Sequence, residues 1–294
     1  MTDIYAEFGV SRQGHFQSIE RAKTIKEKEL LFVGFIIEIR KIHPGMGLRL
    51  MYEQFQPSGI GRDAFIALGL YNGFRLKTAV DPQRTTFSDK SSPYPNLIID
   101  KELTHVNQLW VSDLFYFHLN GKHYYIVLIM DVYSRRIVGY NAGANMRAQQ
   151  NVKALNMALK LRGVDKYNNQ LIHHSDRGSQ YTSQAYTDLL KEYEILISMC
   201  TDVLDNSYSE RVNGTIKNSY LKLWDIHNES QLKKIFIHKA IKAYNNRQHR
   251  SLNKKTPIEF EIYVNELSQK DRPVFKVFTV SNQISENENQ LSLF

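Results

Sequence analysis

Runs of apolar and aromatic residues, separated by polar turns, predict a series of β-strands in the middle of the chain. Two long runs of apolar and aromatic residues are separated by Asn120-Gly121, a typical two-residue hairpin turn. A third strand and two shorter apolar runs follow. The predicted strands cover about residues 109–119, 123–132 and 136–142, the residues before Asp176, and 195–199.

Apolar residues spaced three to four positions apart predict helices between and after these strands. The predicted helices cover about residues 148–161 and 183–193, the segment that contains Glu210, about 229–247, and the residues after Thr256-Pro257. Three antiparallel strands followed by helix, strand, helix, strand and helix is the element order of a ribonuclease H-like fold. The expected fold class is therefore α/β, with a mixed five-stranded sheet flanked by helices.

The first quarter of the chain has a purely helical pattern. Ser18 is a candidate N-cap for a helix that runs to about Ile42, where His43-Pro44-Gly45 ends it. Two short helices are predicted for about residues 48–55 and 63–70. Short helices joined by a glycine-containing turn are consistent with a DNA-binding helix-turn-helix module, although the pattern alone more often indicates an ordinary helical hairpin. Nearby basic residues, among them Arg62 and Arg75, favour DNA binding.

Changes in composition divide the chain into five parts. Prolines with serine, threonine and aspartate indicate a linker with little structure of its own, and the end of the chain is rich in asparagine, glutamate and serine. The predicted parts are an N-terminal helical module (1–77), the linker (78–106), the ribonuclease H-like core (107–225), a C-terminal helical extension (226–267) and a partly flexible tail (268–294).

Charge and cysteine content narrow the function. The 294 residues carry a formal net charge of +8, which favours a polyanionic partner such as nucleic acid. Cys200 is the single cysteine, so an intrachain disulfide and a multi-cysteine zinc site are excluded. No apolar run reaches the ~20 residues of a membrane span, and the N-terminus lacks a signal-peptide pattern. We therefore expect a cytoplasmic protein without membrane contact.

Three carboxylates occupy matching positions in the predicted core. Asp113 lies in the first strand, Asp176 follows a buried strand, and Glu210 begins a helix. Each one taken alone is more often a surface charge or a helix cap. Brought together, the three would repel one another, and a hard divalent cation such as Mg²⁺ relieves that repulsion. Two such ions can support displacement at phosphorus, so the trio indicates phosphoryl-transfer chemistry.

The motifs around these acids resemble a known family. The segments that carry the resemblance are Trp110-Val111-Ser112-Asp113, Ile129 to Gly139, His173 to Tyr181, Ser198-Met199, Asp205-Asn206 with Glu210, and Tyr244-Asn245 to Thr256-Pro257. They are similar to the OrfB-type DDE transposases of the bacterial IS-three family, which are relatives of retroviral integrases. The resemblance covers roughly residues 8–262.

The resemblance implies a function and a site. Asp113, Asp176 and Glu210 would be the catalytic metal ligands, holding two Mg²⁺ ions for which Mn²⁺ can substitute. The reaction would be cleavage at insertion-sequence ends, followed by attack of the freed 3′ hydroxyl on another phosphodiester. The implied partners are the terminal repeats and target DNA, an upstream OrfA product or frameshift fusion, and further copies of the chain on DNA.

Several basic residues are candidates for DNA contact. Lys217 lies two turns after Glu210 on about the same helix face, and Gly214 between them would allow close approach of a backbone. Arg177 follows Asp176 and either binds phosphate or braces the loop. Arg247, His249 and Arg250 form a predicted basic patch. Of His173 and His174, which point to opposite faces of a strand, we expect one to pack in the core.

Two other functions fit the same features. One is a non-catalytic DNA-binding regulator, either a decayed copy or a fragment that occupies the ends. The other is a ribonuclease H-like nuclease that cleaves without joining. The intact trio argues against a decayed copy, and the flanking modules with the region from Tyr244-Asn245 to Thr256-Pro257 favour the transposase.

Overall fold

The computed structural model describes residue 9 and residues 11–76, 93–145, 148–201 and 203–277. The chain divides into two compact units at residues 78 and 79, and each unit is considered by itself. None of the helices in the described ranges is both long and apolar enough to cross a membrane.

The described part of the first unit contains the helices α2 (Arg12–Ile42), α3 (Leu48–Phe55) and α4 (Arg62–Tyr71). Its small core is formed by Ile36, Ile39, Met46, Leu48, Met51 and Phe65. Helix α2 begins earlier than predicted, because Ser11 rather than Ser18 is the N-cap. The Ser11 hydroxyl accepts a 3.0 Å hydrogen bond from the Gly14 amide, whereas the Ser18 hydroxyl donates to a carbonyl inside the helix.

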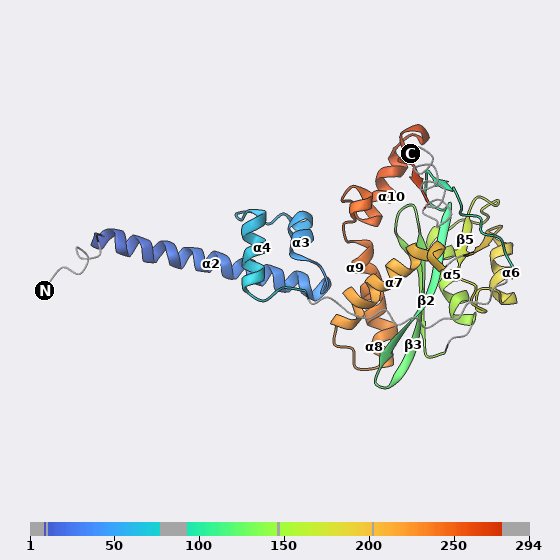
Figure 1. Cartoon of the computed structure of the whole chain (residues 1–294), viewed down its shortest axis with the longest axis horizontal. Coiled ribbons are helices and arrows are strands. Elements are labelled where there is room, and N and C mark those ends of the chain that lie inside the picture. The colour runs from blue at the N-terminus through green and yellow to red at the C-terminus, as the bar shows by residue number, and fades with distance from the viewer. Residues whose placement is uncertain (1–8, 10, 77–92, 146–147, 202, 278–294) are drawn as a thin grey trace, which may run out of the picture. The chain divides into compact units, whose positions relative to one another are not determined.

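The second unit is built on a five-stranded sheet of β2 (Leu109–Leu119), β3 (Lys122–Asp131), β4 (Ile137–Gly143), β5 (Ile172–Ser175) and β6 (Leu196–Met199). The strand order is β4-β3-β2-β5-β6. The first three strands pair antiparallel, whereas β5 runs parallel to β2 and β6 runs parallel to β5. This mixed sheet confirms the predicted ribonuclease H-like fold (Figure 1).

The predicted hairpin between β2 and β3 is also present. Asn120 and Gly121 have φ values of 50° and 75°, the left-handed backbone that a two-residue type I′ turn requires. Asparagine and glycine tolerate this conformation better than other residues do. The turn fixes the register in which Leu119 pairs with Lys122 and Asp113 with Leu128.

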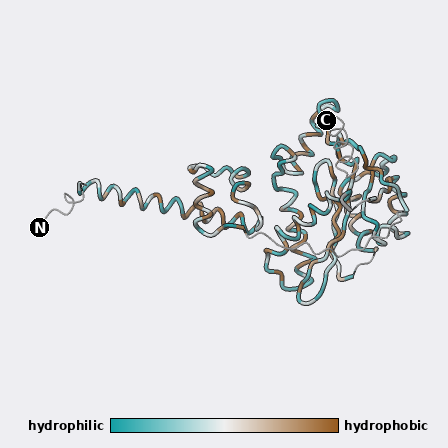
Figure 2. The backbone as a smooth tube through the Cα atoms, in the orientation of Figure 1, coloured by the Kyte–Doolittle hydropathy of each residue, from teal (hydrophilic) through white to brown (hydrophobic). Residues whose placement is uncertain are grey.

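Helices cover both faces of the sheet, and a hydrophobic core lies under each layer (Figures 1 and 2). One core is covered by α5 (Ala148–Arg162) and α6 (Gln184–Glu192). The other is covered by α7 (Ser207–Ser219), α9 (Ile237–Asn245) and α10 (Pro257–Glu266). Gly139 lets α5 approach β4 closely, because a Cβ there would lie 2.2 Å from the Ala154 carbonyl oxygen.

Short elements complete the second unit. They are β1 (Glu102–Leu103), the 3₁₀ turns η1 (Val203–Asn206), η2 (Leu221–Leu223), η4 (Arg250–Leu252) and η5 (Gln269–Asp271), α8 (Glu229–Gln231), the π-helical turn η3 (Leu232–Phe236), and β7 (Phe275–Lys276). The helix predicted for about residues 229–247 therefore contains a π-helical turn near its start.

Part of the predicted linker has structure of its own. Strand β1 pairs antiparallel with β7, and Ile98 and Leu103 are fully buried in the core. Residues 93–106 and the start of the predicted tail thus pack onto the second unit. Their apolar side chains contact the hydrophobic core there, which the composition of the segment alone does not reveal. Residues 78–92 of the predicted linker and residues 278–294 of the predicted tail lie outside the described residues.

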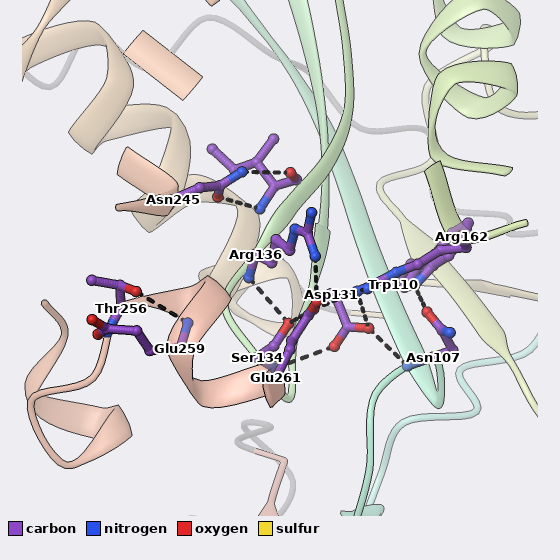
Figure 3. A network of polar contacts seen from close by, with 11 residues as sticks. Asn107, Trp110, Asp131, Ser134, Arg136, Arg162, Asn245, Thr256, Glu259 and Glu261 are labelled. Atoms are coloured by element: carbon purple, nitrogen blue, oxygen red, sulfur yellow. Dashed lines mark hydrogen bonds and ion pairs between the residues drawn. The ribbon is translucent and has the colours of Figure 1, made fainter. Parts of the chain in front are cut away.

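A buried ionic network joins the C-terminal extension to the sheet (Figure 3). The Arg162 guanidinium contacts Asp131 at 3.1 Å and Glu261 of α10 at 2.7 Å. Arg136 also pairs with Glu261, at 2.5 Å, and the Ser134 hydroxyl donates to the same carboxylate. Every charge in the network has a partner of opposite sign, so α10 is bound to the β3–β4 turn as well as packed on the core.

A second polar contact holds the C-terminal extension against β4. The Asn245 side chain accepts a hydrogen bond from the Ile137 amide and donates one to the Ile137 carbonyl, both at 2.9 Å (Figure 3). The paired donor and acceptor satisfy both backbone groups of one residue on a strand at the edge of the sheet. Asn245 therefore has a structural role in this protein.

Candidate active site

Asp113 and Asp176 lie in equivalent places on neighbouring parallel strands. Ser112 of β2 pairs in register with Ser175 of β5, and each aspartate is the residue that follows. In-register neighbours on parallel strands point to the same face of the sheet and lie about 5 Å apart. The structure therefore brings these two carboxylates together, as the positions of the two predicted strands imply.

The environment of Asp113 disfavours a negative charge. Burial, followed by repulsion from Asp176 and a smaller repulsion from Glu210, raises the pKa of Asp113 to about 7. Hydrogen bonds from the Leu114 amide and from Asn213 oppose this rise. Burial also raises the pKa of Asp176, whose Oδ1 accepts a 3.0 Å hydrogen bond from the Gly178 amide. A cation at this place would stabilise both ionised carboxylates.

Helix α7 brings the third acid to the pair. Glu210 lies in its first turn, and Asn213, one turn later, donates a 2.9 Å hydrogen bond to Oδ2 of Asp113. The Asn206 side chain, just before α7, donates to the Ser112 carbonyl at 3.3 Å. These two amides hold the helix across β2. Glu210 itself is exposed, and partial burial of its carboxylate raises its pKa.

The donor set suits a hard divalent cation. It consists of carboxylate oxygens, and the raised pKa of Asp113 shows that the like charges lie close enough to repel one another. The three side chains do not form a finished ligand cluster, since no group of three or more His, Cys, Asp and Glu side chains within the described ranges lies in position to hold a metal. Because Glu210 is exposed, its side chain can rotate toward the two aspartates without unpacking the core.

Both histidines before Asp176 pack in the core, whereas only one was expected to. Tyr186 contacts Nε2 of His173 at 2.9 Å, and Ser198 contacts Nδ1 of His174 at 2.8 Å. Burial lowers the pKa of His173 to about 3 and that of His174 to about 4, so both are neutral at pH 7. Each face of β5 is covered by helices, which explains why neighbouring residues are both buried.

Arg177 braces the loop after β6. Its Nε donates a 2.9 Å hydrogen bond to the Cys200 carbonyl, and a terminal nitrogen donates to the Thr201 carbonyl. These bonds join the turn that carries Asp176 to the segment that leads into α7. Of the two roles considered for Arg177, the geometry supports bracing.

Lys217 and Gly214 line the exposed side of α7. The Lys217 ammonium lies 4.3 Å from the centroid of the Tyr116 ring, a cation–π contact that keeps it beside β2. Gly214 has open space where a side chain would be, since a Cβ there would meet nothing within 4 Å. Its missing side chain leaves the middle of the helix accessible to another molecule.

The predicted basic patch after α9 contains only two cations. The His249 ring packs against Tyr244 with centroids 4.8 Å apart, and burial lowers the pKa of His249 to about 4. The prediction that His249 adds charge to this patch is therefore wrong, because packing keeps the ring neutral at pH 7. Arg250 is exposed and Arg247 is half-buried.

Sequence reasoning missed Asn213 and Arg162. Asn213 follows Glu210 by three residues, a spacing that places both on one helix face and could have linked it to the site. Arg162 could not have been found, because its partners Asp131 and Glu261 are separated from it by 31 and 99 residues.

The chain is similar to an integrase core domain and to proteins encoded by insertion sequences. A family model described as an integrase core domain matches residues 104–202. The uncharacterized 31 kDa protein of insertion element IS600 from Shigella sonnei is 31% identical over 251 residues, which cover 83% of this chain and 91% of that protein. The transposase of insertion sequence IS629 from Shigella sonnei is 35% identical over 184 residues, covering 61% of this chain and 58% of that protein.

Among solved structures, the catalytic core domain of the HTLV-2 integrase in complex with magnesium is 19% identical. The structural similarity covers 58% of this chain and 99% of the solved chain, with a TM-score of 0.41. The similarity to the IS600 protein extends over nearly the whole of both chains, well beyond the integrase core. The chain thus belongs to the insertion-sequence transposases, within the superfamily that shares the retroviral integrase core.

Proposed function

We propose that this transposase cleaves DNA at the ends of its insertion sequence and joins the freed 3′ hydroxyl to another phosphodiester. The observation that carries this proposal is the pair of aspartates that follow the in-register residues Ser112 and Ser175 on neighbouring parallel strands, with α7 held beside them by the Asn213–Asp113 bond. Oxygen ligands gathered in this way are suited to phosphoryl transfer, which needs positioning and charge neutralisation rather than a protein nucleophile.

Asp113, Asp176 and Glu210 are the proposed metal ligands. Bound Mg²⁺, or Mn²⁺ in its place, would supply charge neutralisation and an activated oxygen nucleophile at the scissile phosphate. The residues of this chain have separate tasks. The aspartates remain fixed by the sheet, the Gly178 amide and Asn213 orient their oxygens, and exposed Glu210 completes the set when DNA is bound.

The proposed DNA contacts lie around α7 and after α9. Lys217, held by Tyr116, is placed to contact a phosphate beside the trio, and the open space at Gly214 leaves room for the DNA backbone. Arg247 and Arg250 are the cations of the second region. We further propose that the chain acts as an oligomer on the insertion-sequence ends, with an upstream OrfA product or fusion supplying additional end recognition.

A strand-joining assay tests this function. Purified protein is mixed with duplexes that carry the two genomic ends of its element and with a target plasmid, in Mg²⁺ or Mn²⁺. We expect joined products with wild type, and a loss of about 10²–10³-fold or more for Glu210→Gln, Asp113→Asn and Asp176→Asn. Double variants should be no worse than single ones, because the three acids act as a unit.

A matched control removes an acid elsewhere. Glu192→Gln changes an exposed glutamate at the end of α6 and should join DNA as wild type does. Cleavage without joining would favour a nuclease. Binding without chemistry in either metal, with OrfA supplied, would favour the regulator or decayed copy and overturn the proposal.

A further inference from the structure

Two arginines are held against tyrosines at opposite ends of α7. The Arg135 guanidinium, in the β3–β4 turn, lies 4.5 Å from the ring centroid of Tyr208 at the start of the helix. Arg247, after α9, forms a side-chain hydrogen bond with Tyr220, the residue that follows α7. Tyr220 follows Tyr208 by twelve positions, which correspond to a rise of about 18 Å along a helix. The two guanidinium groups therefore lie beside the first turn and beside the C-terminal end of α7.

A third arginine, Arg211 of α7, acts electrostatically on a residue near the other two. Burial raises the pKa of Tyr244 well above its usual range, and the positive charges of Arg135, Arg247 and Arg211 all oppose that rise. Arg135 and Arg247 also lower the pKa of His249, after the larger effect of burial. The three cations come from a turn, a helix and a loop, yet all three act on Tyr244, and Arg135 and Arg247 also act on His249, which packs against it. We call Arg135, Arg211 and Arg247 the arginine track.

The arginine track has no acidic counterpart in the described part of the chain. No carboxylate there forms an ion pair with any of its three residues, whereas their neighbours Arg136 and Arg162 are paired with Asp131 and Glu261. The buried Nε2 of His249, inside the arginine track, has no hydrogen-bond partner among the described residues. Three like charges gathered around neutral rings therefore lack the anion that would balance them.

Arg135 also has an unusual backbone. Its φ of 60° lies in the left-handed region, which non-glycine residues other than asparagine and aspartate adopt infrequently. The turn nonetheless places an arginine there, and Tyr208 supports its planar head. A guanidinium held in this way keeps its N–H groups available for a phosphate, which it can bind through two parallel hydrogen bonds.

We propose that the arginine track binds successive phosphates of the DNA backbone along the flank of α7. Three guanidinium groups with no acidic partner among the described residues suit a polyanion that offers several phosphates rather than a single ion. Because Glu210 lies on the same helix, contacts along the arginine track would set the register of the strand at the trio. Arg135, Arg211 and Arg247 are thus positioning residues, and this role rests on the proposed function.

The salt dependence of DNA binding tests the arginine track. The full-length chain is titrated against a labelled 30-base-pair duplex of random sequence at several NaCl concentrations, with Ca²⁺ in place of Mg²⁺. Each phosphate contact contributes about 0.9 to the slope of log K against log salt. We expect Arg135→Gln/Arg211→Gln/Arg247→Gln to reduce the slope by about 2.7. The double variant Arg211→Gln/Arg247→Gln, which leaves the β3–β4 turn intact, should reduce it by about 1.8.

The matched control removes three exposed lysines elsewhere in the same unit, as Lys160→Gln/Lys191→Gln/Lys270→Gln. An equal slope in the control and in the folded arginine variants would overturn the proposal. So would arginine variants that bind the duplex normally but lose binding to oligo-glutamate, which would indicate an acidic protein partner. Because no chemistry is measured, a reduced slope supports the arginine track even if joining fails, and an unchanged slope rejects it even if joining succeeds.

Discussion

Asn213 donates a hydrogen bond of 2.9 Å to the Asp113 carboxylate, and this bond connects α7 to β2 at the candidate active site. Hydrogen bonds to charged groups contribute about 1.5–3 kcal/mol. We expect Asn213→Ala to slow single-turnover joining by roughly 10- to 100-fold, because the carboxylate is no longer oriented. Affinity for DNA should change little, which gel-shift titration would check.

A control for this variant lies on the same helix. Asn218→Ala removes a side-chain amide of α7 that forms no hydrogen bond with the three acids in the described part of the chain, and the variant should join DNA at the wild-type rate. Equal rates for Asn213→Ala and wild type would show that Asn213 has no part in positioning Asp113.

Two glycines should respond in opposite ways to alanine. In Gly139→Ala the new Cβ would lie 2.2 Å from the Ala154 carbonyl oxygen, so we expect a loss of about 1–3 kcal/mol or more in unfolding free energy. In Gly214→Ala the Cβ meets nothing within 4 Å, and the helix should gain about 0.5–1 kcal/mol. Urea denaturation of both variants measures the difference, and destabilisation by Gly214→Ala would contradict this account.

The buried network around Arg162 should be essential for stability. Arg162→Leu would leave the carboxylates of Asp131 and Glu261 without their shared partner, and breaking a buried pair in this way costs about 3–5 kcal/mol. Denaturant unfolding followed by circular dichroism would measure this loss of unfolding free energy. In the same assay, Lys41→Gln disrupts an exposed pair with Glu38 and should cost less than about 1 kcal/mol. Equal losses in the two variants would argue against the network.

Acid should destabilise the protein through His173. Its pKa is near 3 when folded and about 6.5 when unfolded, so the unfolded state binds the proton more readily. Stability is therefore lost as pH falls from about 6.5 toward 3, with a slope of about 1.4 kcal/mol per pH unit. His173→Gln removes this contribution. Unfolding free energies between pH 7 and 4.5 should show a shallower dependence for the variant.

Comparing wild type with His173→Gln isolates the contribution of His173 to the pH dependence of stability. Asp113, whose pKa is raised to about 7, changes stability in the opposite direction as pH falls, but it titrates in both proteins. Parallel pH profiles for wild type and His173→Gln would mean that His173 is not buried in its neutral form.

The sequence alone determined the order of the elements and the fold class. The apolar runs in β2 and β3, the turn at Asn120-Gly121 and the spacing of apolar residues in α5 depend on local geometry, and the structure agrees with them. The positions of Asp113 within a strand, Asp176 directly after a strand and Glu210 in the first turn of a helix are local features of the same kind. Local patterns can be read directly, because neighbouring residues alone define them.

Tertiary structure decided the contacts between distant segments. The Asn213–Asp113 bond, the Arg162 network and the arginine track each join residues that are tens of positions apart. The burial of both His173 and His174, and the packing of β1 against β7, likewise depend on what covers them. Periodicity reports which residues share a face of one element. The partner of that face, and therefore the charge and burial of each side chain, is determined only when the elements pack together.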